Sequence, residues 1–389
     1  MKLGVLKEIK PDENRVALQP KQVKHLLKSG HSVYVETNAG IHSQYDNEEY
    51  KYCGAIISDK QTVLKNSELI LKIKAPLSSE FNDYQHFHML FSYLHFDENI
   101  STECIMKLIK RGFMGIAYEW IEVDGKYPLL EPMSRLTGYL FAQKATELCT
   151  KYKGILCGRY ESFANGATVL IIGLGNIGLS VLRYYILNKV NILIVDKHPE
   201  TINTRINERF QTTNIDYINT CSLRIIKFDT NHPVIAKNKI SQLLPQVDIV
   251  LNCAVRRPDL PKHKFKYLID QDMIQLLSPG SIVCDTTACD RDLIETCISS
   301  EYIDKVDIIN KVVHYNCDHI PSYIARTSTN ILTNLSFPYI KTIADHGMNS
   351  SIMNNSAIRS GIVCYKGHIT HEYTAEKKKL TKVNILDLI

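Results

Sequence analysis

Short apolar runs alternate along the whole chain with longer segments whose apolar residues recur at helical spacing. This alternation is typical of α/β folds, in which helices connect parallel strands. We expect strands at residues 3–6, 32–35, 69–73, 89–94, 115–117, 168–172, 192–195, 247–251 and 281–284. Two long helices are also expected. One spans 134–152 with Ser134 as its N-cap, and the other spans 326–346, contains Pro338 and ends at Gly347.

A glycine-rich segment directly follows the apolar run 168–172 and reads Gly173-Leu174-Gly175-Asn176-Ile177-Gly178. Asp196 closes the next apolar run, so the order is strand, glycine turn, helix, strand and carboxylate. Dinucleotide-binding folds need that order: the three glycines allow a tight turn, close approach of a pyrophosphate, and close packing of helix on strand. The pattern predicts a nicotinamide dinucleotide site. A glycine turn in an α/β domain that binds no nucleotide is the alternative.

Asp196 also bears on the choice of cofactor. Its carboxylate can accept hydrogen bonds from a ribose 2′-hydroxyl and would repel a 2′-phosphate. Lys197 follows directly and leaves some tolerance of NADP open. We expect NAD, bound by the glycine loop, Asp196 and Lys197.

The bulk composition narrows the class of protein. The 389 residues suffice for two domains, and the net charge of +5 is spread along the chain. Lysines cluster only at 377–379, which we interpret as a solvated tail rather than a nucleic-acid site. None of the 11 cysteines forms a CxxC pair, so we expect reduced thiols and no metal site. With neither a signal peptide nor a membrane-length apolar stretch recognised, we expect a cytoplasmic protein with no membrane partner.

The position of the glycine loop in mid-chain predicts an inserted domain. We expect a dinucleotide-binding domain over residues 131–304, inserted into a substrate domain made of 1–130 and 305–389. Both are expected to be Rossmann-like, doubly wound parallel sheets. A cleft between the two lobes would then hold the substrate.

Three potential cations follow strands of the first domain: Arg15, Lys74 and His95. The carboxyl ends of parallel strands are where α/β sheets bind ligands. Arg can bind a carboxylate with two hydrogen bonds, Lys can polarise a keto or imine group, and His can transfer a proton near neutral pH. Each residue taken singly has an ordinary alternative, as a solvated charge or a structural histidine.

Several segments together resemble the alanine dehydrogenase family, which is related to the transhydrogenase α subunit and to saccharopine dehydrogenases. They extend almost from end to end of the chain: Gly4–Lys10 with Arg15-Val16-Ala17, Leu71–Pro76, Phe91–His95, Ala117-Tyr118-Glu119, Pro132-Met133-Ser134, Gly154–Leu156, the glycine loop, His314-Tyr315 and Ala325–Thr329.

The resemblance implies NAD-dependent interconversion of L-alanine with pyruvate and ammonia, by a homohexamer. It implies that Arg15 and Lys74 bind the substrate, that His95 is the acid/base and that Ser134 contacts the cofactor. Two alternatives remain open. One is an imine reductase of the opine or saccharopine type, which joins an amino acid to a keto acid. The other is an NAD-binding homologue without turnover.

One departure from the family concerns a catalytic aspartate. The family pattern resembles Asp-Val-Ala-Ile-Asp-Gln-Gly-Gly, whereas residues 285–292 here read Asp-Thr-Thr-Ala-Cys-Asp-Arg-Asp. An alignment without gaps puts Cys289 at the catalytic position. Either a shift of one residue lets Asp290 serve, or the carboxylate is missing. The glycine pair is also replaced, by Arg291 and Asp292, which removes backbone freedom.

A second departure is Asp318-His319-Ile320-Pro321 where the family has Ala-Asn-Met-Pro. We hypothesise that Asp318 or His319 replaces the lost proton-handling group, with His319 at the substrate; a tolerated substitution is the alternative. Arg256 and Arg257 stand in a loop that is mostly apolar in the family. They would either recruit a larger or more acidic substrate or face water.

Overall fold

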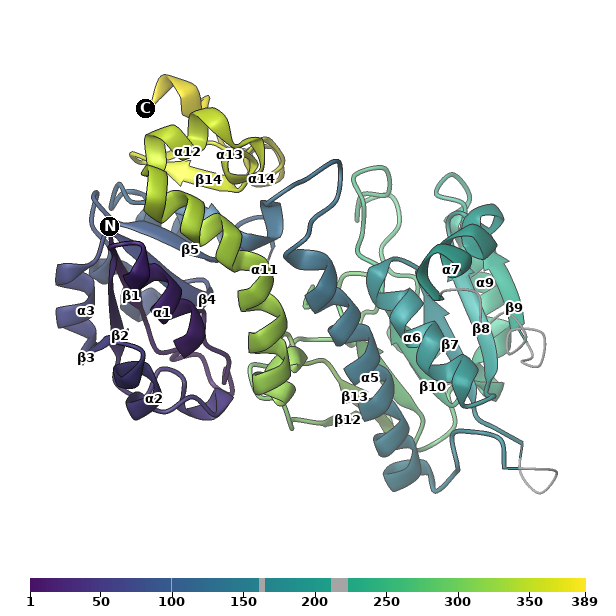
Figure 1. Cartoon of the computed structure of the whole chain (residues 1–389). Coiled ribbons are helices and arrows are strands. Elements are labelled where there is room, and N and C mark those ends of the chain that lie inside the picture. The colour runs from purple at the N-terminus through teal and green to yellow at the C-terminus, as the bar shows by residue number, and fades with distance from the viewer. Residues whose placement is uncertain (99, 161–164, 211–222) are drawn as a thin grey trace. The chain divides into compact units, whose positions relative to one another are not determined.

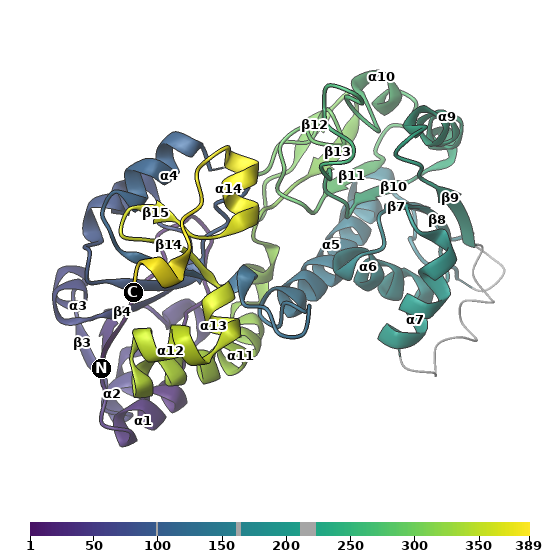
Figure 2. The same ribbon diagram turned by 90° about the horizontal axis from the view of Figure 1, so that it is seen from above.

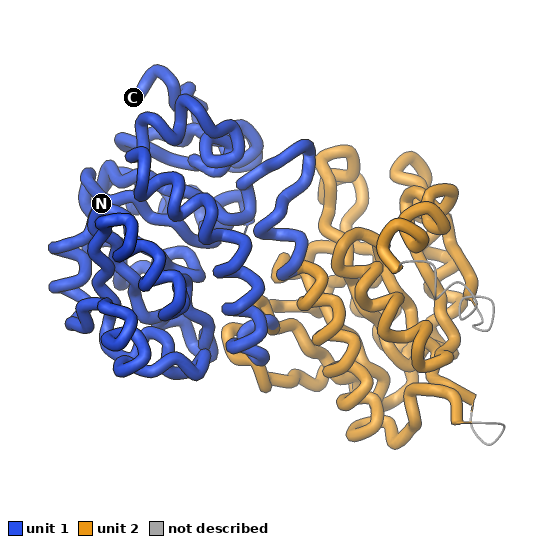
Figure 3. The backbone as a smooth tube through the Cα atoms, viewed as in Figure 1, with its two compact units in different colours: residues 1–133, 321–389 blue, residues 134–320 orange. Residues whose placement is uncertain are grey.

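The computed structural model describes residues 1–98, 100–160, 165–210 and 223–389, which divide into two compact units (Figure 3). Unit 1 comprises residues 1–133 and 321–389, and unit 2 comprises residues 134–320. The first limit falls within α5 (Leu130–Lys153). The second lies beyond the expected residue 305, because β12 (Asp307–Ile309) and β13 (Val312–Tyr315) are strands of the unit 2 sheet.

In its described part, unit 1 has an eight-stranded sheet ordered β15-β14-β6-β5-β4-β1-β2-β3 (Figure 1). Six parallel strands make up most of it: β1 (Lys2–Val5), β2 (Ser32–Glu36), β3 (Ile56–Ser58), β4 (Leu69–Lys74), β5 (Met89–Tyr93) and β6 (Met114–Ala117). The hairpin of β14 (Ile362–Tyr365) and β15 (His368–Ile369) extends the β6 edge antiparallel. The strand pattern did not predict this hairpin.

Helices cover both faces of the unit 1 sheet. One face buries a core of apolar side chains from the strands and from α3 (Lys60–Asn66), α4 (Thr102–Ile109) and α14 (Glu372–Lys378). Figure 2 shows α1 (Pro20–Lys28), α11 (Ala325–His346) and α12 (Met348–Asn354) on the opposite side from α4 and α14. Two short helices, α2 (Asn47–Tyr52) and α13 (Ser356–Ser360), complete the unit.

The described part of unit 2 has a seven-stranded sheet ordered β12-β13-β11-β10-β7-β8-β9, in which only β12 is antiparallel. Its other strands are β7 (Thr168–Ile172), β8 (Asn191–Asp196), β9 (Leu223–Lys227), β10 (Ile249–Asn252) and β11 (Ile282–Asp285). Helices α9 (Pro233–Leu243) and α10 (Gln271–Ile274) pack on one face. On the other face lie α5, α6 (Asn176–Leu187) and α7 (Ile202–Phe210) (Figure 2). Two α/β units with mostly parallel sheets confirm the expected fold class.

Several local expectations have definite outcomes. Helix α11 ends at His346, and Gly347 follows it directly with a positive φ of 75°, which favours glycine. Ser134 is not an N-cap, because α5 begins four residues earlier. Lys377 and Lys379 are exposed, as the interpretation of 377–379 as a solvated tail requires, but the Lys378 ammonium donates hydrogen bonds to the carbonyls of Glu98 (2.5 Å) and Ile100 (2.7 Å).

Two further observations concern the chain as a whole. The cysteines in the described ranges form no disulfide. Among those residues, the helices are also too short or too polar to span a bilayer.

Candidate functional site

The three predicted cations of unit 1 follow neighbouring strands. β4 lies between β1 and β5, and all three run parallel, so the segments after them leave the sheet at one edge. Lys74 pairs in register with Tyr93, and the Tyr93 ring stacks on the His95 ring with centroids 5.5 Å apart. The structure therefore brings Arg15, Lys74 and His95 to the same edge, where parallel sheets bind ligands. We call it the cationic edge.

Arg15 is held in a buried ion pair with Glu13. Its Nε and Nη2 donate to the two carboxylate oxygens of Glu13 at 2.7 and 2.6 Å, and only 4% of the Arg15 side chain is exposed. The backbone amides on either side donate to hydroxyls from the C-terminal part of the chain: Asn14 to Ser322 (2.7 Å) and Val16 to Thr329 (3.1 Å). The C-terminal segment therefore fixes the loop that carries Arg15.

His95 has a left-handed backbone conformation, with φ of 46°. The buried carboxylate of Glu119 accepts hydrogen bonds from the backbone amides of Leu94 (3.2 Å) and His95 (2.6 Å), which stabilises this turn. The ring Nδ1 lies 3.3 Å from an oxygen of Glu98. Burial lowers the pKa of His95, but the carboxylates of Glu98 and Glu119 outweigh it and raise the pKa to about 9. Sequence reasoning found His95 but not its two carboxylate partners.

Lys74 ends β4 beside a second, fully buried lysine. The carboxylate of Glu8 accepts hydrogen bonds from the amides of Ile73 (2.5 Å) and Lys74 (3.3 Å), which fixes the end of the strand. The Lys72 ammonium is buried between Glu8 (3.7 Å) and Glu80 (2.7 Å). Lys72 is buried inside the unit, whereas Lys74 is half-buried at the end of its strand, on the cationic edge.

The glycine loop of unit 2 has the shape that a dinucleotide needs. Gly173 has a φ of 84°, and a Cβ there would lie 2.7 Å from the Cβ of Ala254. A Cβ on Gly178 would collide with the carbonyl oxygen of Gly173. A Cβ on Gly175 would meet nothing within 4 Å, so this exposed position at the N-terminus of α6 leaves room for a pyrophosphate. The loop fits a dinucleotide phosphate.

The open space at Gly175 and the close packing at Gly178 predict different results for alanine substitutions at these two positions. Gly175→Ala is expected to leave the melting temperature unchanged and to weaken NADH binding at least tenfold, because the methyl group occupies the pyrophosphate position. Gly178→Ala is expected to cost about 1–3 kcal/mol in unfolding free energy, because it overpacks the turn. Thermal melts and NADH fluorescence titrations measure both. Equal NADH affinity in Gly175→Ala and the wild type would contradict this placement of the phosphate.

Other residues predicted to bind the cofactor lie around this loop. Gly138 of α5 packs against the carbonyl of Ile177, and half-buried Ser134 lies one helical turn before it. The Asn176 side chain accepts a hydrogen bond from Arg209 of α7. Lys197 is exposed and forms an ion pair with Asp259.

Asp196 ends β8 beside the glycine loop and is nearly fully engaged. One oxygen accepts from the Leu174 amide (2.8 Å), and the other accepts from the His198 amide (2.9 Å) and from Arg205 (2.7 Å). Burial raises the pKa of Asp196, but Arg205 and these amides outweigh it and keep the pKa below its usual value. Arg205 comes from α7 and was not found by sequence reasoning.

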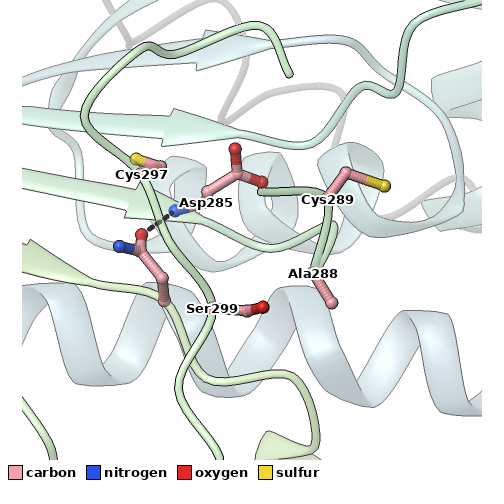
Figure 4. A pocket seen from close by; sticks show the side chains of 6 residues that line it. Asp285, Ala288, Cys289, Cys297 and Ser299 are labelled. Atoms are coloured by element: carbon pink, nitrogen blue, oxygen red, sulfur yellow. Dashed lines mark hydrogen bonds between the residues drawn. The ribbon is translucent and has the colours of Figure 1, made fainter. Parts of the chain in front are cut away.

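The end of β11 and the loop after it line a small pocket (Figure 4). Its lining residues are Asp285, Ala288, Cys289, Cys297, Ser299 and Asn316. Asp285 is buried, and burial raises its pKa to about 6 although hydrogen bonds from Thr287 and Asn252 lower it in part.

Asp290 is exposed, and its carboxylate accepts two hydrogen bonds from Ser299 (2.8 and 2.7 Å). Cys289, not Asp290, lines the pocket. Asp285 ends a strand as Asp196 does, a signal that could have identified it.

His319 and Asp318 form a pair inside unit 2. The His319 ring is fully buried, and its Nδ1 is hydrogen-bonded to the Asp318 carboxylate. The Cys317 sulfur lies 3.9 Å from the same nitrogen. Within the described residues, these three consecutive side chains form the group whose donor atoms are spaced closely enough for a metal ion. The placement of His319 at the substrate stays a prediction.

Arg256 has a structural role. Its guanidinium and backbone amide bond the Asp292 carboxylate at 2.8 Å each, and the guanidinium also donates to the carbonyls of Leu260, Phe265, Lys266 and Asp292. The idea that Arg256 recruits a substrate is therefore wrong, because its donors are used within the unit. Arg257 is exposed. Two departures from the family pattern, Arg256 and Asp292, thus stabilise each other.

Comparisons with known proteins agree over the whole chain. The family model "Alanine dehydrogenase/PNT, N-terminal domain" matches residues 4–137, and the corresponding C-terminal domain model matches residues 139–372. An alanine dehydrogenase of Staphylococcus haemolyticus is 31% identical over 395 residues, covering 100% of this chain and 99% of the relative. Alanine dehydrogenase 2 of Staphylococcus aureus is 32% identical over 382 residues, covering 97% and 96%.

Solved structures show the same fold. An L-alanine dehydrogenase superposes with a TM-score of 0.80 at 24% identity, with both chains fully covered. A transhydrogenase from Sinorhizobium meliloti superposes with a TM-score of 0.70 at 19% identity, covering 95% of this chain and 99% of the other.

Proposed function

Because the chain belongs to the alanine dehydrogenase/PNT family, we propose that it is an NAD-dependent L-alanine dehydrogenase. It would interconvert L-alanine with pyruvate and ammonia. The observation that carries the proposal is the cationic edge, where Arg15, Lys74 and His95 follow three neighbouring parallel strands. A 2-keto acid presents a carboxylate, a keto oxygen and a site of proton transfer, and the three side chains match these groups in number and kind.

The residues of unit 1 divide this work. Arg15 binds the substrate carboxylate, with Glu13 fixing the plane of the guanidinium by two hydrogen bonds. Lys74 polarises the keto or imine carbon through its charge. His95 exchanges the proton that the reaction takes up or releases. When bound, the nicotinamide supplies or accepts the hydride.

Unit 2 would hold the cofactor by the glycine loop, with Ser134 beside it. We propose NAD as the cofactor because Asp196 ends β8 beside this loop, where an acidic residue excludes a 2′-phosphate. Lys197 forms an ion pair with Asp259, so its charge contributes less to the binding of a 2′-phosphate. The family resemblance further supports a cytoplasmic homohexamer, whose mass light scattering of the purified protein would measure.

The test is an assay of the purified full chain with NADH, ammonium and a panel of keto acids, followed by the loss of NADH absorbance. Oxidation of NADH with pyruvate and ammonium, abolished in His95→Ala, supports the proposal. Turnover only when an amino acid replaces ammonium as the amine donor would assign an opine-type or saccharopine-type reaction instead. NADH binding without turnover across the panel would identify a non-catalytic homologue, which Cys289 at the position of the family aspartate specifically favours.

A further inference from the structure

The carboxylate of Glu98 lies beside the His95 ring. Glu98 lies three residues after His95, and its Oε1 lies 3.3 Å from the ring Nδ1. The pair is reachable from solvent, with 27% of the His95 side chain and 35% of the Glu98 side chain exposed. The left-handed turn at His95 folds the chain back on itself so that these side chains meet. The roles proposed for Arg15, Lys74 and His95 do not involve Glu98.

The surroundings hold Glu98 in place. Lys378 of α14 donates hydrogen bonds to the backbone carbonyls of Glu98 and Ile100, at 2.5 and 2.7 Å. On the other side, Glu119 holds the backbone of His95, and Tyr93 stacks on its ring. Both members of the pair are therefore fixed by separate elements, α14 and the segment after β6.

Other charges face the pair as well. Lys74 of β4 acts against protonation of His95, and Glu119 acts in favour of it. Asp97 lies beside Glu98 and pairs with Lys377 of α14 at 3.8 Å. Burial raises the pKa of Glu98, yet the charges of His95, Lys74 and Lys377 outweigh it and lower the pKa below its usual value. Glu98 therefore stays ionised at neutral pH and favours protonated His95.

The resemblance places a catalytic aspartate in the loop after β11, but that position here is Cys289, and Asp290 is exposed and bonded to Ser299. A cysteine supplies no carboxylate at that position. Resting on the proposed function, we propose that Glu98 is a positioning residue that supplies the carboxylate partner of His95 from within unit 1.

The proton transfer that we propose depends on which ring nitrogen of His95 is paired with Glu98. With Nδ1 directed at Glu98, proton exchange with the substrate falls to Nε2. In the amination direction, ammonia adds to the keto carbon to give a carbinolamine. Its C–O bond then breaks with the electron pair leaving on oxygen, and the Nε2 proton completes a water molecule while the nitrogen lone pair forms the C=N bond. Deamination reverses each step, and neutral His95 takes the proton from water.

The test combines two readouts on the full-length protein. The pKa of His95 is measured by NMR titration of histidine-labelled protein, assigned with His95→Gln, and kcat/KM for pyruvate amination is measured against pH. In Glu98→Gln we expect the pKa of His95 to fall by at least about one unit, which corresponds to a tenfold shift in protonation. The alkaline limb of the profile should move by the same amount. Glu98→Asp should restore part of both.

Glu103→Gln is the matched control, because it makes the same change at a side chain of α4 that is 76% exposed and paired with Lys107. It should leave both readouts unchanged. An unchanged His95 pKa in Glu98→Gln would overturn the inference. A wild type that turns over no substrate would instead refute the proposed function, while the NMR titration would still decide the pairing.

Discussion

Replacing His95 with glutamine is expected to lower kcat for pyruvate amination about 10²–10⁴-fold, the usual contribution of a positioned acid or base. Glutamine keeps a polar side chain of similar length but cannot exchange the proton. The loss should appear in kcat with little change in NADH affinity, because the glycine loop belongs to the other unit. Steady-state kinetics and NADH fluorescence titration measure the two quantities. A variant that retains more than a tenth of the wild-type kcat would exclude His95 as the acid/base.

The pH dependence has a definite sign. Amination uses the protonated ring, so its rate should fall as the pH rises through about 9, the pKa of His95. Deamination uses the neutral ring, so its rate should rise over the same interval. Stopped-flow measurements in both directions would show the two limbs. Limbs that fall near the ordinary histidine value of about 6.5 would mean that the carboxylates of Glu98 and Glu119 do not act on His95 during turnover.

Much of the fold was predictable because its signals are local. Apolar runs predict strands, and the glycine loop with Asp196 predicts a nucleotide-binding unit, since each depends only on neighbouring residues. The cationic edge was predictable for the same reason. Arg15, Lys74 and His95 each follow a strand, and parallel strands place such positions at one edge. The edge hairpin β14–β15 was missed, because short strands at a sheet edge carry little periodicity.

The partners of the site residues could not be predicted, because they come from distant segments or depend on backbone conformation. Arg205 reaches Asp196 from α7, and Arg256 reaches Asp292 across 36 residues. Glu98 is close to His95 in sequence, but only the positive φ at His95 brings the two side chains together. The pattern of residue types does not predict the φ angle of His95.

Two departures from the family thus acquire different explanations. Asp292 is explained by Arg256, since each satisfies the other and fixes the loop around the Asp285 pocket. Cys289 lines the pocket with Asp285 and supplies no carboxylate there. The carboxylate that we infer to act on His95 is Glu98, in unit 1. A substitution that looks like the loss of a family feature when taken alone can therefore be one half of a pair of residues that stabilise each other.

Arg15→Ala is expected to cost about 3–5 kcal/mol in the unfolding free energy of unit 1, because it removes the charge partner of the buried Glu13 carboxylate. The same change should raise KM for pyruvate, since the carboxylate of the substrate loses its cation. The chain has a single tryptophan, Trp120, and it lies in unit 1. Tryptophan fluorescence during urea unfolding therefore reports on this unit alone.

A double variant separates the two effects. Glu13→Gln combined with Arg15→Met removes both charges and keeps most of the volume, so much of the lost stability should return while KM stays high. Arg15→Lys should keep the charge but lose the paired hydrogen bonds, and it should fall between the wild type and Arg15→Ala in both quantities. If Arg15→Ala unfolds within about 1 kcal/mol of the wild type, the buried pair contributes no more than an exposed one, and the hydrogen bonds to Ser322 and Thr329 help to hold the loop without it.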